Sequence, residues 1–139
     1  MKKQVPVSTI MTKNVVKLNL TDDLTKAEML FKKHHIRHIP VVNSNQIVGM
    51  LSYTDLLRIS FVDAVDDADD VVDVTVYNMF TVEQVMAKKL VTVAPETTIR
   101  DVAKILSTRE FHALPVVEGD LLVGIVTTTD IIKYLLEQY

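Results

Sequence analysis

Two short polar strings, 75 residues apart, have the residue types and spacing to bind a ligand. Each places one hydroxyl three residues before an aspartate and a second hydroxyl immediately before it; the side chains are Ser52, Thr54, Asp55, Thr127, Thr129 and Asp130. At a helix start, unpaired N–H groups and the positive end of the helix dipole favour a phosphate. An ionised aspartate in the first turn can accept both hydroxyls of a ribose. The structural alternative is that these residues only cap helices, which is their commonest use.

The elements that must position these strings are also repeated. The run from Ile39 to Leu57 returns as Leu114 to Ile132, with the proline, the Val-Val pair, the Val-Gly pair and the Thr-Asp pair in register. A proline at the start of a strand is tolerated, and the apolar residues around each turn are typical of strands covered on both faces. Each run therefore predicts two strands joined by a tight turn, followed by a helix from Thr54 to about Ser60 and from Thr129 to about Glu137.

The preceding segments complete a larger repeat. Residues 7–13 match 82–88 and predict a helical turn, while 15–18 and 90–93 are rich in β-branched residues and predict short strands. Cap residues at 21–23 and 95–98 then precede apolar residues at helical spacing. We therefore expect an α/β (α+β) fold of two β-α-β-β-α repeats related by pseudo-two-fold symmetry. The repeats span 7–60 and 81–138, with an acidic linker at 61–80.

Composition narrows the class of protein. Either half of a 139-residue chain would be marginal alone, so we expect a shared core. The absence of cysteine excludes disulfides, and the start shows no signal peptide. With no apolar run long enough to span a bilayer, we expect a soluble, cytoplasmic protein.

The net charge of −3 argues against nucleic acid as a partner. Six of the acids lie between Phe61 and Val76, and whether that linker is a helix or a loop stays open.

Catalytic and metal sites are less well supported. His34 and His38 are four residues apart, but Pro40 follows closely and no third ligand completes a tetrahedral set. His34 and His35 fit the end of a helix better. The acidic linker lacks the spacing of a calcium loop. No serine stands beside a base and an orienting group. We therefore expect no metal, no catalytic cofactor and no enzymatic activity.

Both repeats resemble CBS domains, which occur in tandem pairs (Bateman modules) that bind adenosine-containing ligands. The resemblance rests on a string of glycine, an apolar residue, any residue, Ser or Thr, two residues and Asp. Here the string occupies 49–55 and 124–130, each behind a Pro-Val-Val strand. One such string is weak evidence, but two at equal spacing favour ligand binding over capping.

The resemblance implies further ligand contacts. The residue three before the strand proline would reach phosphates, and Arg37 could do so with two bonds. Residues at and before the start of the strand would lie beside the base, and the two lysines ahead of the first strands would face the same cleft, although a solvated surface charge is the commoner role for them. The residues implied in addition to the two polar strings are Lys13, Arg37, His38, Ile39, Pro40, Lys88, His112, Ala113, Leu114 and Pro115.

These expectations define a non-catalytic sensor. It would bind an adenine nucleotide (AMP, ADP or ATP) in clefts between the repeats and regulate an unidentified protein. The family commonly dimerises through its helices, and the apolar pairs at 131–132 and 135–136 suit a homodimer. We expect no appended catalytic, channel or DNA-binding segment, so the output would pass to another copy or a separate partner. Two alternatives stay open: a structural dimerisation module with degenerate sites, and a sensor of S-adenosylmethionine.

Overall fold

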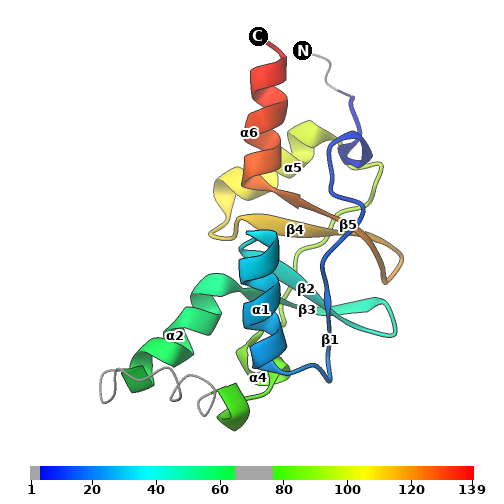
Figure 1. Ribbon diagram of the computed structural model, residues 1–139. Helices are drawn as coiled ribbons and strands as arrows, with labels where there is room; N and C mark the ends of the chain where they lie inside the picture. The colour runs from blue at the N-terminus through cyan, green and yellow to red at the C-terminus, as the bar shows by residue number, and fades with distance from the viewer. Residues whose placement is uncertain (1–3, 65–76) are drawn as a thin grey trace. The chain divides into compact units, whose positions relative to one another are not determined.

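The computed structural model describes residues 4–64 and 77–139, with side chains described for 4–59 and 77–139. The chain divides into two compact units (Figure 1). We call them the first-repeat unit, which comprises 16–44 and 48–90, and the second-repeat unit, which comprises 1–15, 45–47 and 91–139. Both mix strands and helices, which confirms the predicted fold class.

The first-repeat unit contains a small sheet and its helices. The strands are β1 (Leu18–Asn19), β2 (His38–Asn43) and β3 (Gln46–Ser52), and β1 runs parallel to β2, with Leu18 opposite Val41. The helices are α1 (Leu24–His34), α2 (Tyr53–Ala64) and the short α4 (Val82–Val85). Its buried core consists of Leu18, Leu24, Ala27, Phe31, Ile39, Val41, Leu51, Leu56, Tyr77, Val82 and Met86.

The second-repeat unit contains the corresponding hairpin. Strands β4 (Ala113–Glu118) and β5 (Leu121–Thr127) pair antiparallel, and Val93 forms a single parallel bridge to Val116. Its helices are η1 (Val7–Thr9), a short 3₁₀ turn, followed by α5 (Ile99–Thr108) and α6 (Thr128–Glu137). Gln46, at the start of β3, falls in this unit and pairs with Leu121. The core consists of Val7, Val93, Val102, Leu114, Val116 and Val126.

The segments that lead into the repeats are exchanged between the two units. Thr12 pairs with Ile125, and each backbone N–H donates to the other residue's carbonyl at 2.8 and 3.0 Å. Ala87 makes the equivalent pair with Met50 at 2.8 and 3.0 Å. The lead-in of the first repeat thus packs with the second repeat, and that of the second repeat packs with the first. The core of the second-repeat unit therefore includes Val7 from the first lead-in, and that of the first-repeat unit includes Val82 and Met86 from the second.

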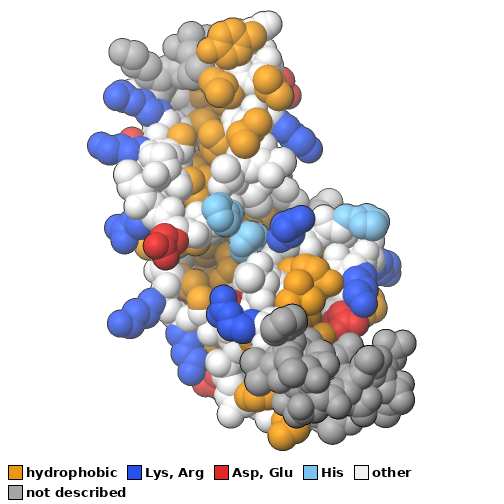
Figure 2. Space-filling model, turned by 90° about the vertical axis from the view of Figure 1, so that its left-hand side faces the viewer, with side chains coloured by type: hydrophobic (Ala, Val, Ile, Leu, Met, Phe, Trp, Pro, Cys, Tyr) orange, Lys and Arg blue, Asp and Glu red, His pale blue; other side chains and the backbone are white. Residues whose placement is uncertain are grey.

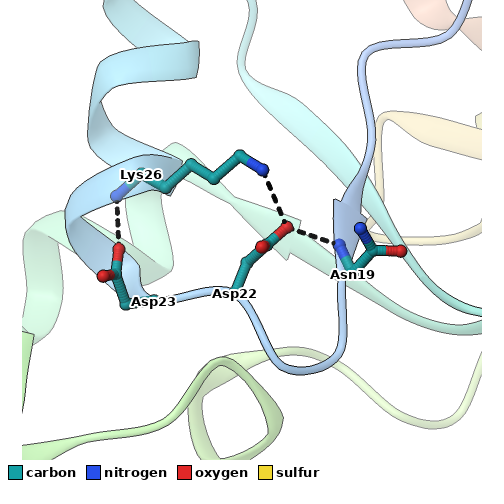
Figure 3. A network of polar contacts seen from close by, with 4 residues as sticks. All are labelled: Asn19, Asp22, Asp23 and Lys26. Atoms are coloured by element: carbon teal, nitrogen blue, oxygen red, sulfur yellow. Dashed lines mark hydrogen bonds and ion pairs between the residues drawn. The ribbon is translucent and has the colours of Figure 1, made fainter.

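Local side-chain bonds fix where α1 starts. Asp23 is the N-cap, and its Oδ1 accepts from the Lys26 backbone N–H at 2.8 Å (Figure 3). Asp22 Oδ2 accepts from the Asn19 N–H at 2.8 Å and from Lys26 Nζ at 3.2 Å. The Asp23 bond satisfies a donor that the helix start leaves unpaired, and the Asp22 bonds tie the end of β1 to the first turn of α1. The helix ends at His35, a left-handed residue with φ 53°.

The predicted first strands are longer than the observed ones. In the first repeat only Leu18–Asn19 is a strand, and in the second only Val93 bridges its neighbour. Val93 exchanges two backbone bonds, donating to the Pro115 carbonyl and accepting from the Val117 N–H, so pairing partners rather than β-branched content set these lengths. The second helices start at Tyr53 and Thr128, one residue before the predicted positions. Of the predicted acidic linker, α2 includes 61–64, and 65–76 lie outside the described residues.

Candidate ligand-binding steps at two strand-to-helix junctions

The first polar string lies where β3 meets α2. Ser52 is the last residue of the strand, and its Oγ accepts from the Asp55 backbone N–H at 3.0 Å. The Tyr53 N–H donates to the Arg37 carbonyl at 2.8 Å. This bond joins the first residue of α2 to the residue that precedes β2, so it places the Arg37 backbone beside the start of the helix. Sequence reasoning did not single out Tyr53, because a backbone donor leaves no residue-type signal.

The second polar string is built in the same way where β5 meets α6. The Asp130 N–H donates to Thr127 Oγ1 at 3.2 Å. The Thr128 N–H donates to the His112 carbonyl at 2.9 Å, and Thr128 Oγ1 donates to the same carbonyl at 3.3 Å. The two units thus carry one geometry twice: a hydroxyl at a helix start, an aspartate in the first turn, and a backbone bond to the residue three before the strand proline.

The two carboxylates differ in their partners. Asp55 Oδ1 accepts from Arg58 Nη1 at 3.1 Å, an ion pair in which the Arg58 side chain is 70% exposed and that of Asp55 is 28% exposed. Asp130 Oδ2 accepts from the Thr127 N–H at 2.9 Å and completes a capping box with the bond from the Asp130 N–H. Capping is therefore a real role of Asp130, and Arg58 is a neighbour of Asp55 that the sequence analysis overlooked.

The glycine of each string allows close packing by a methionine. A Cβ on Gly49 would meet Met86 Sδ and lie 2.8 Å from its Cγ, and a Cβ on Gly124 would lie 2.6 Å from Met11 Sδ. Both methionines belong to the exchanged lead-in segments, which bring them against the strand of the other repeat. The close approach that the glycines permit in this structure is thus made by a methionine side chain.

The other predicted ligand residues divide by exposure. Arg37, His112 and Thr54 are exposed, as are Thr129, Lys13 and Lys88, while His38 is half-buried. Buried in the strands are Ile39, Pro40, Ala113, Leu114 and Pro115, of which Ile39 and Leu114 pack into the two cores. Contact of these residues with a ligand stays a prediction.

The exchange of lead-in segments also assigns the two lysines to units. Lys88 follows Ala87, which pairs with Met50, and it therefore lies in the same unit as Asp55. Lys13 follows Thr12, which pairs with Ile125, and it lies in the unit of Asp130. Each unit consequently combines a polar string from one repeat with a lysine from the other.

The histidines lie apart from any metal-binding arrangement in the described part of the chain. His34 ends α1, His35 is its C-cap and His38 begins β2. Over residues 4–64 and 77–139, no group of three or more His, Asp or Glu side chains is placed to hold a metal ion. None of the helices described is both long and apolar enough to cross a membrane.

Comparison with known proteins identifies the family of this chain. The family model for the CBS domain matches residues 7–61 and 82–137. The chain therefore belongs to the CBS-domain family, with two repeats. It is 33% identical over 136 residues to the uncharacterized protein MJ1404 of Methanocaldococcus jannaschii, covering 96% of this chain and 32% of that protein. Two further relatives from the same organism are covered over 44% and 45% of their length, so the chain spans less than half of these relatives.

Solved structures of CBS-domain pairs share the fold. The structure of CBSX2 in complex with AMP has a TM-score of 0.79 and 21% identity, covering 96% of this chain and 98% of that one. The CBS-domain pair of protein MJ0100, in complex with 5′-methylthioadenosine and S-adenosyl-L-methionine, has a TM-score of 0.77 and 23% identity, covering 97% and 98%. At these identities the likeness establishes the fold.

Proposed function

We propose that this chain is a non-catalytic regulatory module that binds an adenine nucleotide (AMP, ADP or ATP) at its two strand-to-helix junctions. The observation that carries the proposal is the duplicated geometry at these junctions, where a hydroxyl, the first turn of a helix and an aspartate lie together. The helix start favours the phosphate, and the aspartate favours the ribose hydroxyls. The bound state would be passed to a regulated protein, and we place this activity in the cytoplasm.

The CBS-pair fold supports this ligand class. One structure of the same fold contains AMP, and another contains 5′-methylthioadenosine and S-adenosyl-L-methionine. The second makes S-adenosylmethionine a candidate ligand for this chain. That ligand has no phosphate, so the two candidates differ in whether they need the charge of Arg37.

A second part of the proposal is that the chain forms a homodimer. Exposed apolar side chains follow one stripe along and just beyond α6, at i, i+3, i+4 and i+7: Ile132, Leu135, Leu136 and Tyr139, with exposed fractions of 53%, 42%, 68% and 94%. Figure 2 shows apolar side chains gathered over this helix. A contiguous apolar stripe of this kind is typical of an interface, and a second copy presents a matching stripe across a two-fold axis.

A thermal-shift panel tests the ligand class. Purified chain is heated with AMP, ADP, ATP, S-adenosylmethionine or GMP at up to millimolar concentration. Ligand binding to the native state raises the midpoint by mass action. We expect stabilisation by at least one adenine nucleotide and less by GMP. If no adenosine compound raises the midpoint, the sensor proposal fails and the structural dimerisation module becomes the better account.

The same panel separates the two ligand candidates when it is repeated on Arg37→Ala. If the ligand carries phosphate, the variant loses most of its stabilisation by AMP and ATP, because Arg37 no longer supplies a charge beside the helix start. If the ligand is S-adenosylmethionine, stabilisation by that compound is unchanged. His112→Ala is the matched variant in the second-repeat unit.

A further inference from the structure

The carboxylates of the two equivalent aspartates have different hydrogen-bond partners. The role that we infer from this difference rests on the proposed function. Asp55 is bonded outward along its helix to Arg58, whereas Asp130 is bonded back to the Thr127 N–H. In the described part of the chain, no bond joins the Asp55 carboxylate to the Ser52 N–H, which is the equivalent capping bond. The glycine, the second hydroxyl residue and the aspartate are the same in both strings, but a charged residue one turn further along each helix differs.

The residue three places after each aspartate supplies that difference. Arg58 pairs with Asp55, but its equivalent in the second repeat is Lys133, which forms no ion pair within the residues described. A guanidinium presents a planar fork that matches a carboxylate, whereas an ammonium is a strongly hydrated point charge on a flexible stem. An arginine at this position therefore competes better with the capping bond than a lysine does.

We infer that Arg58 is a positioning residue that holds Asp55 out of its capping bond and ready to accept ribose hydroxyls. The Asp55 carboxylate keeps Oδ2 and further lone pairs available to a ligand while Arg58 occupies one position. Asp130 must either give up the Thr127 bond, leaving that N–H unpaired, or bind a ribose through Oδ1 alone. The junction in the first-repeat unit is consequently the tighter of the two and fills first.

The effect expected from Arg58 is modest because its side chain is largely exposed. Exposed ion pairs contribute little, so its removal should weaken binding by about two- to fivefold. Because Arg58 acts through the ribose-binding aspartate, the loss should be the same for a ligand with a phosphate and for one without it. Adenosine and AMP therefore make a matched pair of probes.

The first experiment is calorimetry in an Asp130→Ala background, which leaves the Asp55 junction as the measured site. We expect Arg58→Ala to weaken the binding of adenosine and of AMP by the same two- to fivefold factor, and Arg58→Lys to weaken it less. Weaker AMP binding with unchanged adenosine binding would show that Arg58 contacts the phosphate, and it would overturn the inference. A lower melting temperature with both affinities unchanged would show that Arg58 only forms a surface ion pair, and it would also overturn the inference.

The second experiment introduces the arginine into the other repeat. In an Asp55→Ala background, Lys133→Arg should raise the adenosine affinity of the Asp130 junction by about two- to fivefold, while Lys133→Ala leaves it unchanged. No gain from Lys133→Arg would overturn the inference. If the unmodified chain binds neither adenosine nor AMP, the proposed function and this inference fail together. If binding is lost in Asp55→Ala but does not change when Arg58 is substituted, the proposed function stands and only this inference fails.

Discussion

Glu28 on α1 hydrogen-bonds to Tyr77, which lies in the same first-repeat unit. Tyr77 is buried in the core of that unit, and Lys32 Nζ lies 2.9 Å from Glu28 Oε1. Partial burial acts to raise the pKa of Glu28, but the hydrogen bonds from Tyr77 and Lys32 and the charge of Lys32 outweigh it, so the pKa is lowered overall. The ionised carboxylate is therefore favoured in the folded chain.

This lowered pKa predicts an acid-sensitive contribution to stability. A depressed pKa stabilises the fold above the unfolded-state pKa, and the contribution is lost as the pH falls through the folded-state pKa. Tyr77→Phe keeps the ring and removes one hydrogen bond, so it should lower the free energy of unfolding by about 0.5–1.5 kcal/mol at pH 7. The difference from the unmodified chain should shrink below about pH 4. Urea unfolding at pH 7 and at acid pH measures both values, and a difference that does not depend on pH would contradict the assignment.

At the scale of elements, each unit is closed by a lead-in segment that packs a methionine on a strand glycine. Met86 lies against Gly49 in β3, and Met11 lies against Gly124 in β5. Because protein interiors are close-packed, a methyl group added at either glycine has to displace the methionine. At Gly124 the added Cβ would also lie 3.1 Å from the Thr12 carbonyl oxygen, which belongs to the backbone and yields less readily.

A double-mutant cycle tests this packing. Gly49→Ala should destabilise the chain by about 1–3 kcal/mol through overpacking, and Met86→Ala should destabilise it by about 2–5 kcal/mol by leaving a cavity. The two changes together should cost less than their sum, because the smaller side chain makes room for the new methyl group. Chemical denaturation of the three variants gives the coupling energy. Strictly additive losses would mean that Met86 does not fill the space over Gly49.

The sequence predicts the repeated elements well because their signals are local. Caps such as Asp23 and Thr98 and the two polar strings each act within a few residues, and the structure places them at the predicted helix starts. Pro40 and Pro115, predicted at the start of their strands, are instead the third residues of β2 and β4. The exchange of lead-in segments has no such signal. Met11 and Met86 occupy the same position in their repeats, so either could pack on either glycine, and only the path of the whole chain decides between them.

The candidate site was predictable to the same extent. The hydroxyls and aspartates of both strings lie at helix starts, as their residue types predict. The different states of Asp55 and Asp130 were not predicted, because they depend on Arg58 and Lys133, one turn further along each helix. Backbone donors such as the Tyr53 N–H are common to every residue type and leave no trace in a sequence.

At the scale of the whole molecule, the proposed homodimer can be tested by charging the α6 stripe. Ile132→Lys and Leu136→Lys should each convert a micromolar dimer into a monomer, because a charge buried in an apolar interface is costly. Met79→Lys is the matched control, since Met79 is 67% exposed and lies outside this stripe. Light scattering coupled to size exclusion gives the mass. A monomeric unmodified chain at micromolar concentration would contradict the proposal.

The central claim is that Asp55 and Asp130 each bind one adenosine ligand, and calorimetry with AMP on single and double alanine variants tests it most directly. Each single variant should lose one binding event, and the double variant should lose both, because each carboxylate contributes hydrogen bonds worth about 1.5–3 kcal/mol. Circular dichroism checks that the variants stay folded, since Asp130→Ala also removes the carboxylate bond of the α6 capping box. Unchanged stoichiometry and affinity in both single variants would show that Asp130 only caps its helix and that Asp55 only pairs with Arg58.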